Sequence, residues 1–374
     1  MSKKSKSLKI IISGGGTGGH IFPALSIARA IQRRTQGVEI LFVGAHDRME
    51  MEKIPAAGFK IIGLPITGFQ RKITWKNITF FPKLIISLIK CKSIIKTFNP
   101  DVVVGVGGYA SGPLLRVAQR LKVPTLIQEQ NSYAGITNKL LASKAKKICV
   151  AYHNMGRYFP KNKIVNTGNP IRKDLQDIKN KSTEALRFFN FEPDKKTLLI
   201  IGGSLGARTI NESITLNLDV LIRKNIQVIW QTGKYYYKKA KEEVARYNNH
   251  NISVMEFINR MAFAYSVADV IISRAGAGTI SELCIVGKPI ILVPSPNVAE
   301  DHQTKNALAL VDKNAAVMVK DANAKSELIN NLLELIKDDN KCVEMGVKLQ
   351  KLAKPDADEL IVDEVFKIID NIKN

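Results

Sequence analysis

Short apolar runs that end near glycine or proline recur along this chain, and they restrict its fold more than any other feature. The first half holds six runs rich in Ile, Val and Leu, at residues 8–13, 38–43, 59–64, 101–105, 123–127 and 147–151. The second half repeats the rhythm, at residues 197–202, 226–231, 251–255, 269–273, 289–293 and 315–319. Such runs suit strands buried on both faces of a parallel sheet, with helices between them. We therefore expect an α/β fold with two Rossmann-like, doubly wound domains.

The two halves also repeat their glycine motifs in the same order. The segments "IIISGGGTGGH" and "LLIIGGSLGAR" each run from a strand through a glycine turn into a helix, and each half has a later glycine cluster, at 102–113 and 270–282. Gly168 and Pro170 interrupt the pattern between the halves. We expect domains at 1–165 and 166–355, followed by an amphipathic helix at 356–374 that can pack back on the first domain.

The basic charge of the chain is confined to its first half. Residues 1–173 carry 29 lysine and arginine residues against 6 acidic ones, whereas the remainder carries 27 of each. A one-sided field of this kind attracts a polyanion, such as nucleic acid, an anionic membrane or a phosphate-rich substrate. The chain shows neither an apolar run of the ~18 residues that a membrane span needs nor a signal-peptide pattern, so we expect a cytoplasmic protein. The four scattered cysteines predict reduced packing residues.

The opening glycine loop satisfies the G-x-G-x-x-G pattern through Gly14, Gly16 and Gly19. A dinucleotide site also needs an acid at the end of the second strand. Glu39 lies at the wrong end of that strand and Asp47 lies beyond its turn, which argues against NAD. The loop can still present backbone amides and the positive end of a helix to an anion.

His20 follows this loop directly. The positive end of a helix favours the neutral imidazole, so His20 is placed as a general base. The alternative is a structural histidine that only bonds to the loop.

Three motifs of the second half suit a nucleotide. Ser204, in "GGSLGAR", can donate its hydroxyl to a phosphate, and Ala275 to Gly278 lead into a helix that we expect to begin near Thr279. Glu282, expected in the first turn of that helix, can take ribose hydroxyls or can close a capping box with Thr279. The polar segment 294–307 can bind sugar hydroxyls or form a solvated turn.

Taken together, eight motifs in register resemble the MurG family of peptidoglycan N-acetylglucosaminyltransferases. They are "GGGTGGHIFPAL", "GVGGYASGP", "QEQNSYAGITNK", "GNPIR", "GGSLGAR", "EFI", "RAGAGTISE" and "EDHQTKNA", over residues 8 to 320. Leu205 and His302 depart from the commonest family pattern. The resemblance implies a GT-B fold, with two domains facing a cleft, and an inverting transfer of N-acetylglucosamine from UDP-N-acetylglucosamine to the 4-hydroxyl of lipid I, which gives lipid II.

The resemblance also implies site residues. The positions that match the family's donor contacts are Thr17, Gly18, Gly19, Asn131, Arg172, Ser204, Ile258, Ala277, Gly278, Thr279, Ile280, Ser281, Glu282 and Gln303. Ile258 would meet the uracil through its backbone, Glu282 the ribose, and Gln303 the sugar. The acceptor would lie near His20, Gly16, Tyr109 and Asn131.

No D-x-D metal motif appears between the candidate strands, so we expect neither a metal nor another cofactor. Helix-terminal amides, Ser204 and Arg172 would stabilise the leaving UDP. His20 is the expected catalytic base and Glu129, in "QEQN", is the second candidate.

An acceptor on a lipid also accounts for the basic charge. We expect Trp75, Ile78, Phe81 and Leu84, beside neighbouring lysines and arginines, to contact an anionic membrane, which places the protein peripherally on the cytoplasmic face of the inner membrane. Residues 88–98 are expected to form an ordinary core-facing helix. No nucleic-acid-binding module is recognisable, which argues against nucleic acid as the partner. The remaining alternatives are a UDP-N-acetylglucosamine 2-epimerase, which shares fold and donor, and a non-catalytic nucleotide-sugar sensor.

Overall fold

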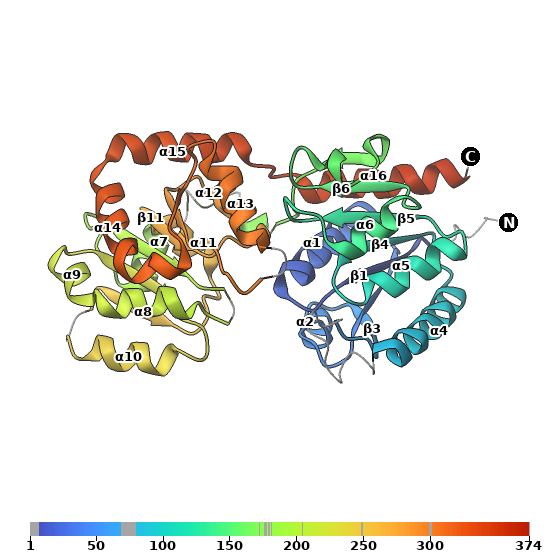
Figure 1. The fold of residues 1–374 in the computed structure, drawn as a ribbon, viewed down its shortest axis with the longest axis horizontal. Coiled ribbons are helices and arrows are strands. Elements are labelled where there is room, and N and C mark those ends of the chain that lie inside the picture. Colours follow the sequence, from blue (N-terminus) through green and yellow to red (C-terminus); the bar gives the residue numbers. More distant parts are fainter. Residues whose placement is uncertain are drawn as a thin grey trace. The chain divides into compact units, whose positions relative to one another are not determined.

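The computed structural model describes residues 7–68, 80–171, 173–175, 178, 180, 182–203, 205–247, 250–298 and 301–373 (Figure 1). The chain forms two compact units, one of Met1–Ile171 with Asp356–Asn374 and one of Arg172–Pro355. The first unit therefore extends to Ile171 rather than to residue 165. The closing segment 356–374 is part of that unit.

The first unit is built on a seven-stranded parallel sheet. Its strands are β1 (Lys9–Gly14), β2 (Glu39–Ala45), β3 (Lys60–Leu64), β4 (Val102–Gly107), β5 (Thr125–Glu129), β6 (Lys147–Val150) and β7 (Ile164–Asn166). They lie in the order β3-β2-β1-β4-β5-β6-β7. The order reverses direction between β1 and β4, and this reversal opens a crevice at the carboxyl ends of these two strands.

Helices cover both faces of this sheet because alternate strand residues are buried on opposite sides. Ile10 and Ile12 pack with α1 (Gly18–Arg34) and α16 (Ala357–Lys373), whereas Ile11 packs with α4 (Phe80–Phe98) and α5 (Ser111–Arg120). The shorter α2 (Glu50–Ala56) and α6 (Ile136–Ala142), and the 3-10 turns Met155–Arg157 and Lys161–Lys163, complete the unit.

Helix α16 is fixed to α1 by an apolar seam and by ion pairs. Ile361 and Val365 are fully buried in the cluster that also holds Ile27. At the end of α1, Arg33 contacts Asp358 at 2.7 Å and Arg34 contacts Asp363 at 2.5 Å. The last helix of the chain thus belongs to the core of the first unit.

The second unit repeats the plan with a six-stranded parallel sheet. Its strands are β8 (Thr197–Ile201), β9 (Gln227–Gln231), β10 (Ile252–Met255), β11 (Val270–Ser273), β12 (Ile290–Leu292) and β13 (Val317–Met318), in the order β10-β9-β8-β11-β12-β13. The reversal lies between β8 and β11.

The helices of this unit alternate with its strands. They are α7 (Ser182–Phe189), α8 (Arg208–Leu216), α9 (Leu218–Arg223), α10 (Tyr237–Ala245), α11 (Met261–Val267), α12 (Ala277–Val286), α13 (His302–Val311), α14 (Ala324–Lys337) and α15 (Asp339–Leu352), with 3-10 turns at Lys173–Leu175 and Asp321–Asn323. None of the helices in the described ranges combines the length and the apolar character needed to cross a membrane.

The expectation of two doubly wound α/β domains is confirmed, and each of the twelve expected strands overlaps an observed one. The sequence analysis did not predict β7, which has only three residues and lies just before Gly168 and Pro170, where the pattern is interrupted. In both units the first glycine loop and the later glycine cluster follow the two strands that flank the reversal. The repeated motifs therefore lie at the switch points of the two sheets, where open α/β sheets in general bind ligands.

Candidate functional site

In the first unit the two glycine segments touch each other through their backbones. A Cβ atom added to Gly108 would lie 2.3 Å from the Gly15 carbonyl oxygen, and Gly108 has φ +88°. Ser111, at the start of α5, donates its hydroxyl to the carbonyls of Ser13 and Gly107, both at 2.9 Å. The second glycine cluster thus holds the opening loop from the side of β4.

His20 is the third residue of α1 and lies in this junction. Its Nδ1 is 3.1 Å from the Gly15 carbonyl oxygen and 3.5 Å from Thr17 Oγ1. Because a carbonyl can only accept, the bond to Gly15 requires a proton on Nδ1, and in the neutral imidazole the lone pair then lies on Nε2. A Cβ atom on Gly107 would lie 2.7 Å from Nε2, so only glycine at this position leaves room for the imidazole.

The other acceptor positions expected from the resemblance lie around the same loop. Gly16 precedes the Thr17 N-cap of α1, and a Cβ atom on Gly16 would lie 3.9 Å from the Tyr109 ring. The Tyr109 side chain is about half exposed. Gly18 and Gly19, which the resemblance implies as donor contacts, are the first two residues of α1. The structure therefore brings His20, Gly16 and Tyr109 together.

Glu129, the second candidate base, is buried and fully engaged by its own loop. Its Oε1 accepts from the backbone and side-chain nitrogens of Asn131, at 3.1 and 3.3 Å. Its Oε2 accepts from the Gly135 amide at 3.0 Å and from Asn138 Nδ2 at 2.8 Å. With four donors bound, this carboxylate holds the loop between β5 and α6 in place.

A second buried carboxylate, which no sequence motif predicts, lies beside the opening loop. Glu50, the first residue of α2, is fully buried. It accepts from the Gly16 amide at 2.8 Å and from the Ala45 amide at 3.0 Å. The amide of Gly16 therefore points to an internal carboxylate.

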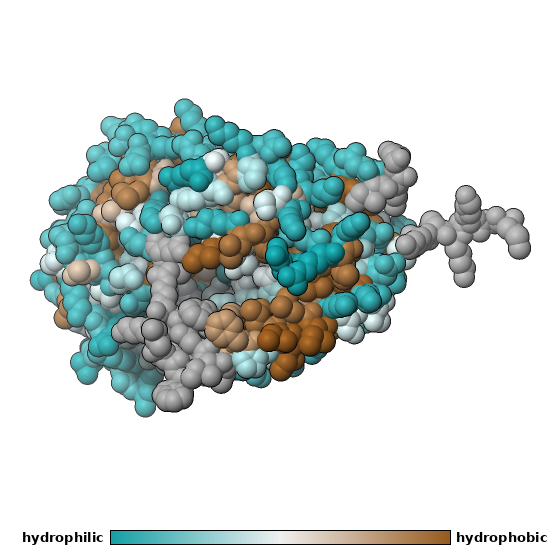
Figure 2. Space-filling model, turned by 45° about the vertical axis from the view of Figure 1, so that its right-hand side comes forward, coloured by the Kyte–Doolittle hydropathy of each residue, from teal (hydrophilic) through white to brown (hydrophobic). Residues whose placement is uncertain are grey.

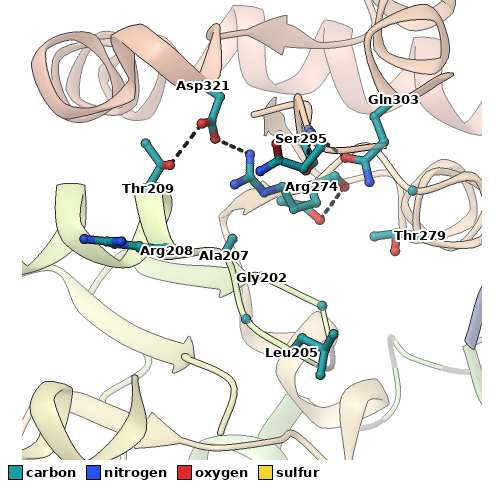
Figure 3. Close-up of a pocket in the computed structure, with 15 residues that line it drawn as sticks. Gly202, Leu205, Ala207, Arg208, Thr209, Arg274, Thr279, Ser295, Gln303 and Asp321 are labelled. Carbon is teal, nitrogen blue, oxygen red and sulfur yellow. Dashed lines mark hydrogen bonds and ion pairs between the residues drawn. The ribbon is translucent and has the colours of Figure 1, made fainter. Parts of the chain in front are cut away.

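The second unit has an open hollow of about 480 Å³ at the reversal between β8 and β11 (Figure 3). Its lining comes from the loop after β8, the start of α12, the loop after β12 and the start of α13. The residues are Gly202, Gly203, Leu205, Gly206, Ala207, Arg208, Thr209, Ser273, Arg274, Gly276, Thr279, Ser295, Asn297, Gln303 and Asp321. Nine of these fifteen residues are glycine, alanine, serine or threonine, whose small side chains suit a site that binds phosphate through backbone amides.

The loop after β8 is shaped by a close approach to the end of β9. A Cβ atom on Gly206 would lie 2.0 Å from the Thr232 carbonyl oxygen, which also accepts from Asn211 Nδ2 at 2.8 Å. Gln231 connects two neighbouring segments. Its Nε2 donates to the Gly203 carbonyl and its Oε1 accepts from the Ile258 amide, both at 3.0 Å. The Ile258 amide is therefore used internally.

The helix after the third motif begins earlier than expected. Helix α12 starts at Ala277 with Gly276 as its N-cap, so Thr279 is its third residue and Glu282 lies in the second turn. The capping-box alternative for Glu282 is therefore wrong. Glu282 instead accepts from Tyr265 Oη at 3.2 Å.

The residues from Ala277 to Glu282, expected as donor contacts, do not all face the hollow. Thr279 lines the hollow, whereas Ile280 is buried and the Ser281 hydroxyl donates to the Ala277 carbonyl at 3.0 Å. Gly278 has open space beside its Cα.

Gln303 lies on the wall of the hollow, at the start of α13. Its Oε1 accepts from the Ser295 amide at 2.9 Å, so it also fixes the loop after β12. In Figure 3, Gln303 and Thr279 lie on one side of the hollow and Leu205 on the other.

An ion pair that the sequence analysis missed forms the back of the hollow. Arg274 binds Asp321 and donates to the carbonyls of Val293 at 3.0 Å and Pro294 at 3.2 Å. Asp321 also accepts from Thr209 at 3.0 Å (Figure 3). The partners are 47 residues apart, so no local pattern could reveal them. At the rim, Lys325 and Arg208 lower the pKa of the Glu212 carboxyl to about 2 through hydrogen bonds and charge.

An exposed apolar surface lies on α4 of the first unit. We define the α4 apolar face as Phe81, Ile85, Ile86 and Ile89, each more than half exposed. Figure 2 is turned so that the part of the molecule with α4 comes forward. It shows apolar side chains gathered on this face, with hydrophilic residues around them. Leu84, expected in this surface, instead packs against the core, and Ile89 extends the surface into the segment expected to face inward.

Four expected site residues fall outside the described part of the chain. They are Trp75, Ile78, Arg172 and Ser204.

Two family models match the chain in succession. The glycosyltransferase family 28 N-terminal domain matches residues 10–150, and the glycosyltransferase family 28 C-terminal domain matches residues 197–361.

Curated relatives match almost the whole chain. A protein of Bacteroides thetaiotaomicron is 59% identical over 97% of this chain and 98% of its own length, and one of Parabacteroides distasonis is 56% identical over 98% and 99%. Both are named UDP-N-acetylglucosamine–N-acetylmuramyl-(pentapeptide) pyrophosphoryl-undecaprenol N-acetylglucosamine transferase.

Solved structures share the architecture. Acinetobacter baumannii MurG is similar with a TM-score of 0.77 and 30% identity, over 97% of this chain and all of that one. A UDP-GlcNAc 2-epimerase from Neisseria meningitidis, bound to UDP-GlcNAc, reaches a TM-score of 0.68 at 14% identity, over 97% of this chain and all of that one. The second likeness concerns the fold alone.

Proposed function

This chain belongs to glycosyltransferase family 28, and from that membership we propose that it transfers N-acetylglucosamine from UDP-N-acetylglucosamine to lipid I, forming lipid II for peptidoglycan. The fold is of the GT-B type. The observation that carries the proposal is the 59% identity, over nearly the full chain, to a protein named for this reaction. The epimerase is less well supported because its likeness is confined to the fold.

The donor binds the second unit, in the hollow between β8 and β11. The loop from Gly202 to Ala207 and the start of α12 supply amides for the pyrophosphate, and Thr279 supplies a hydroxyl. Gln303, held through its Oε1, offers its Nε2 to the sugar. Arg274 is held by Asp321, so it orders the wall of the hollow and its charge is already balanced.

The chemical step is a displacement with inversion at the anomeric carbon. Nε2 of His20 takes the proton of the acceptor 4-hydroxyl while the new carbon–oxygen bond forms. The bond from the anomeric carbon to the β-phosphate oxygen breaks, and UDP leaves with the electron pair. Amides at the start of α12 stabilise the charge that develops on the pyrophosphate.

Glu129, the second candidate for the catalytic base, instead holds the loop between β5 and α6. Its four hydrogen bonds hold Asn131, Gly135 and Asn138 in place, and the carboxylate is 2% exposed. A proton acceptor must reach the substrate hydroxyl. Glu129 therefore shapes the acceptor loop, and His20 is the base.

The α4 apolar face binds the surface of an anionic membrane, at the cytoplasmic side of the inner membrane. Helix α4 carries Lys83, Lys90, Lys92 and Lys96 and no acidic residue. Apolar side chains enter the boundary of the headgroups, and each nearby cation contributes about 1 kcal/mol toward anionic lipid. This contact brings the enzyme to its lipid-linked acceptor.

One assay separates the three candidate activities. UDP-N-acetylglucosamine is incubated with the chain, with and without a lipid I analogue, and UDP and sugar products are measured. We expect UDP release and a disaccharide-lipid product only when the analogue is present. Formation of the 2-epimer without the analogue would establish an epimerase, and binding without turnover in either condition would establish a sensor.

A further inference from the structure

The buried carboxylate of Glu50 is enclosed in space that two glycines provide. A Cβ atom on Gly15 would lie 2.1 Å from Oε1, and one on Gly44 would lie 2.6 Å from Cγ. Any other residue at either position would displace the side chain. The end of β1 and the end of β2 are thus both shaped around this acid.

Glu50 and His20 bind opposite ends of one peptide group. The N–H of Gly16 donates to Oε2 of Glu50 at 2.8 Å. The C=O of Gly15, in the same peptide unit, accepts from Nδ1 of His20 at 3.1 Å. The result is a continuous chain of carboxylate, amide and imidazole.

Such a chain acts on the imidazole in two ways. The carboxylate polarises the peptide, which makes its carbonyl oxygen a stronger acceptor for the Nδ1 proton. It also fixes the orientation of the peptide plane, because the second oxygen is bound to the Ala45 amide at 3.0 Å. An acceptor at Nδ1 selects the tautomer whose Nε2 carries the lone pair.

We propose that Glu50 is a positioning residue for the transfer reaction, holding His20 in its Nδ1–H tautomer through the Gly15–Gly16 peptide. This inference rests on the proposed function, in which Nε2 of His20 accepts the proton. It assigns a reason to the burial of an acid whose two oxygens both accept from backbone amides. It also explains why the Gly16 amide is not left open to an anion.

The test combines kinetics with nitrogen NMR of the histidine ring. The variants are Glu50→Gln, His20→Ala, the double variant, and Glu52→Gln as a control on the same helix whose side chain is exposed. We expect Glu50→Gln to lower kcat about 10- to 100-fold, as the loss of an orienting partner does elsewhere. KM for UDP-N-acetylglucosamine should stay within about 2-fold, and Glu52→Gln should match the wild type. In the His20→Ala background Glu50→Gln should cause no further loss.

The NMR readout needs no turnover. In ¹⁵N-labelled protein, with the His20 signal assigned by its absence from His20→Ala, we expect Nδ1–H in the wild type and a mixture of tautomers in Glu50→Gln. A His20 ring that stays in the Nδ1–H form in Glu50→Gln, or rate losses that multiply in the double variant, would overturn the proposal. If Glu50→Gln does not fold, Glu50→Asp, which keeps the charge and shortens the reach, is judged by the same criteria. A wild-type chain without transferase activity would instead count against the proposed function.

Discussion

The two glycine loops follow equivalent strands in two similar sheets, yet they differ in whether the protein's own side chains bind their backbones. In the first unit, side chains of the same chain bind the backbone of the loop after β1. Glu50 binds the Gly16 amide, and His20 binds the Gly15 carbonyl. In the second unit the loop after β8 borders an open hollow of about 480 Å³. A loop that is already bonded can orient a reactive side chain, whereas an open one can receive a ligand.

The charge of the chain follows the same division. The first unit, residues 1–171 and 356–374, carries 29 basic and 12 acidic residues, whereas residues 172–355 carry 27 and 21. In the second unit even the arginine at the back of the hollow is paired with Asp321. Most of the net positive charge therefore lies in the unit that carries the α4 apolar face.

The largest expected effect concerns chemistry in the first loop. We expect His20→Ala to lower kcat by ~10²–10⁴, since the general base is lost. The dissociation constant for UDP should be unchanged, because the hollow is built from other residues. Steady-state kinetics with a lipid I analogue and calorimetric titration of UDP measure the two quantities. A normal kcat in His20→Ala would contradict the assignment of the chemical step to the first loop.

A smaller effect concerns the packing of the second loop. Gly206→Ala should destabilise the second unit by about 2–4 kcal/mol, because its Cβ would meet the Thr232 carbonyl and its φ is +79°. Gly203→Ala is the matched control, with φ +82° and no atom within 4 Å of its Cβ, and should cost about 1–2 kcal/mol. Urea unfolding compares them, and equal losses would show that the close approach to β9 does not shape this loop.

The surface of the first unit gives the next expectation. Phe81→Asp should weaken binding to vesicles of anionic phospholipid about 10-fold or more, because an exposed aromatic side chain is replaced by a charge of the same sign as the lipid. Binding of the wild type should also fall as salt rises. Val343→Asp, at a similarly exposed site on α15, is the control. Equal loss in both variants in a sedimentation assay would contradict a membrane contact confined to α4.

The smallest effect concerns the rim of the second hollow. Lys325 and Arg208 lower the pKa of Glu212 to about 2 from the ordinary 4.5. The stabilisation is therefore fully present above pH 4.5 and is lost as the pH falls toward 2. Glu212→Gln should reduce unfolding free energy by less than about 1 kcal/mol at pH 7, because Arg208 and Lys325 are exposed. If the difference in unfolding free energy between Glu212→Gln and the wild type grew as the pH fell, it would contradict a pKa that is lowered in the folded state.

Sequence reasoning located the strands and the glycine loops because both depend on local pattern. A run such as Ile10 to Ile12 identifies a buried strand by itself, and glycines at its end identify the turn. The start of α12 was misplaced by two residues because the T-x-x-E pattern of Thr279 and Glu282 imitates a cap. Gly276 takes the cap position instead, with extended backbone at φ −67° and ψ 142°.

The remaining site features depend on contacts between distant segments. Glu50 lies 34 residues from Gly16 and is two positions from Glu52, an exposed acid of the same helix. Nothing in the local pattern distinguishes the two. Arg274 and Asp321 are likewise joined only when β11 and the turn after β13 come together. The sequence therefore predicted the strands and turns that border the candidate site, and the fold determined which charges are paired within it.

The division between the loops is tested most directly by hydrogen–deuterium exchange of the chain with and without UDP. We predict slower exchange in residues 202–209 and 274–282, which border the hollow, and unchanged exchange in residues 14–20, where the loop is already bonded internally. Slower exchange in residues 14–20, with no change in 202–209, would contradict the assignment of the donor to the second unit.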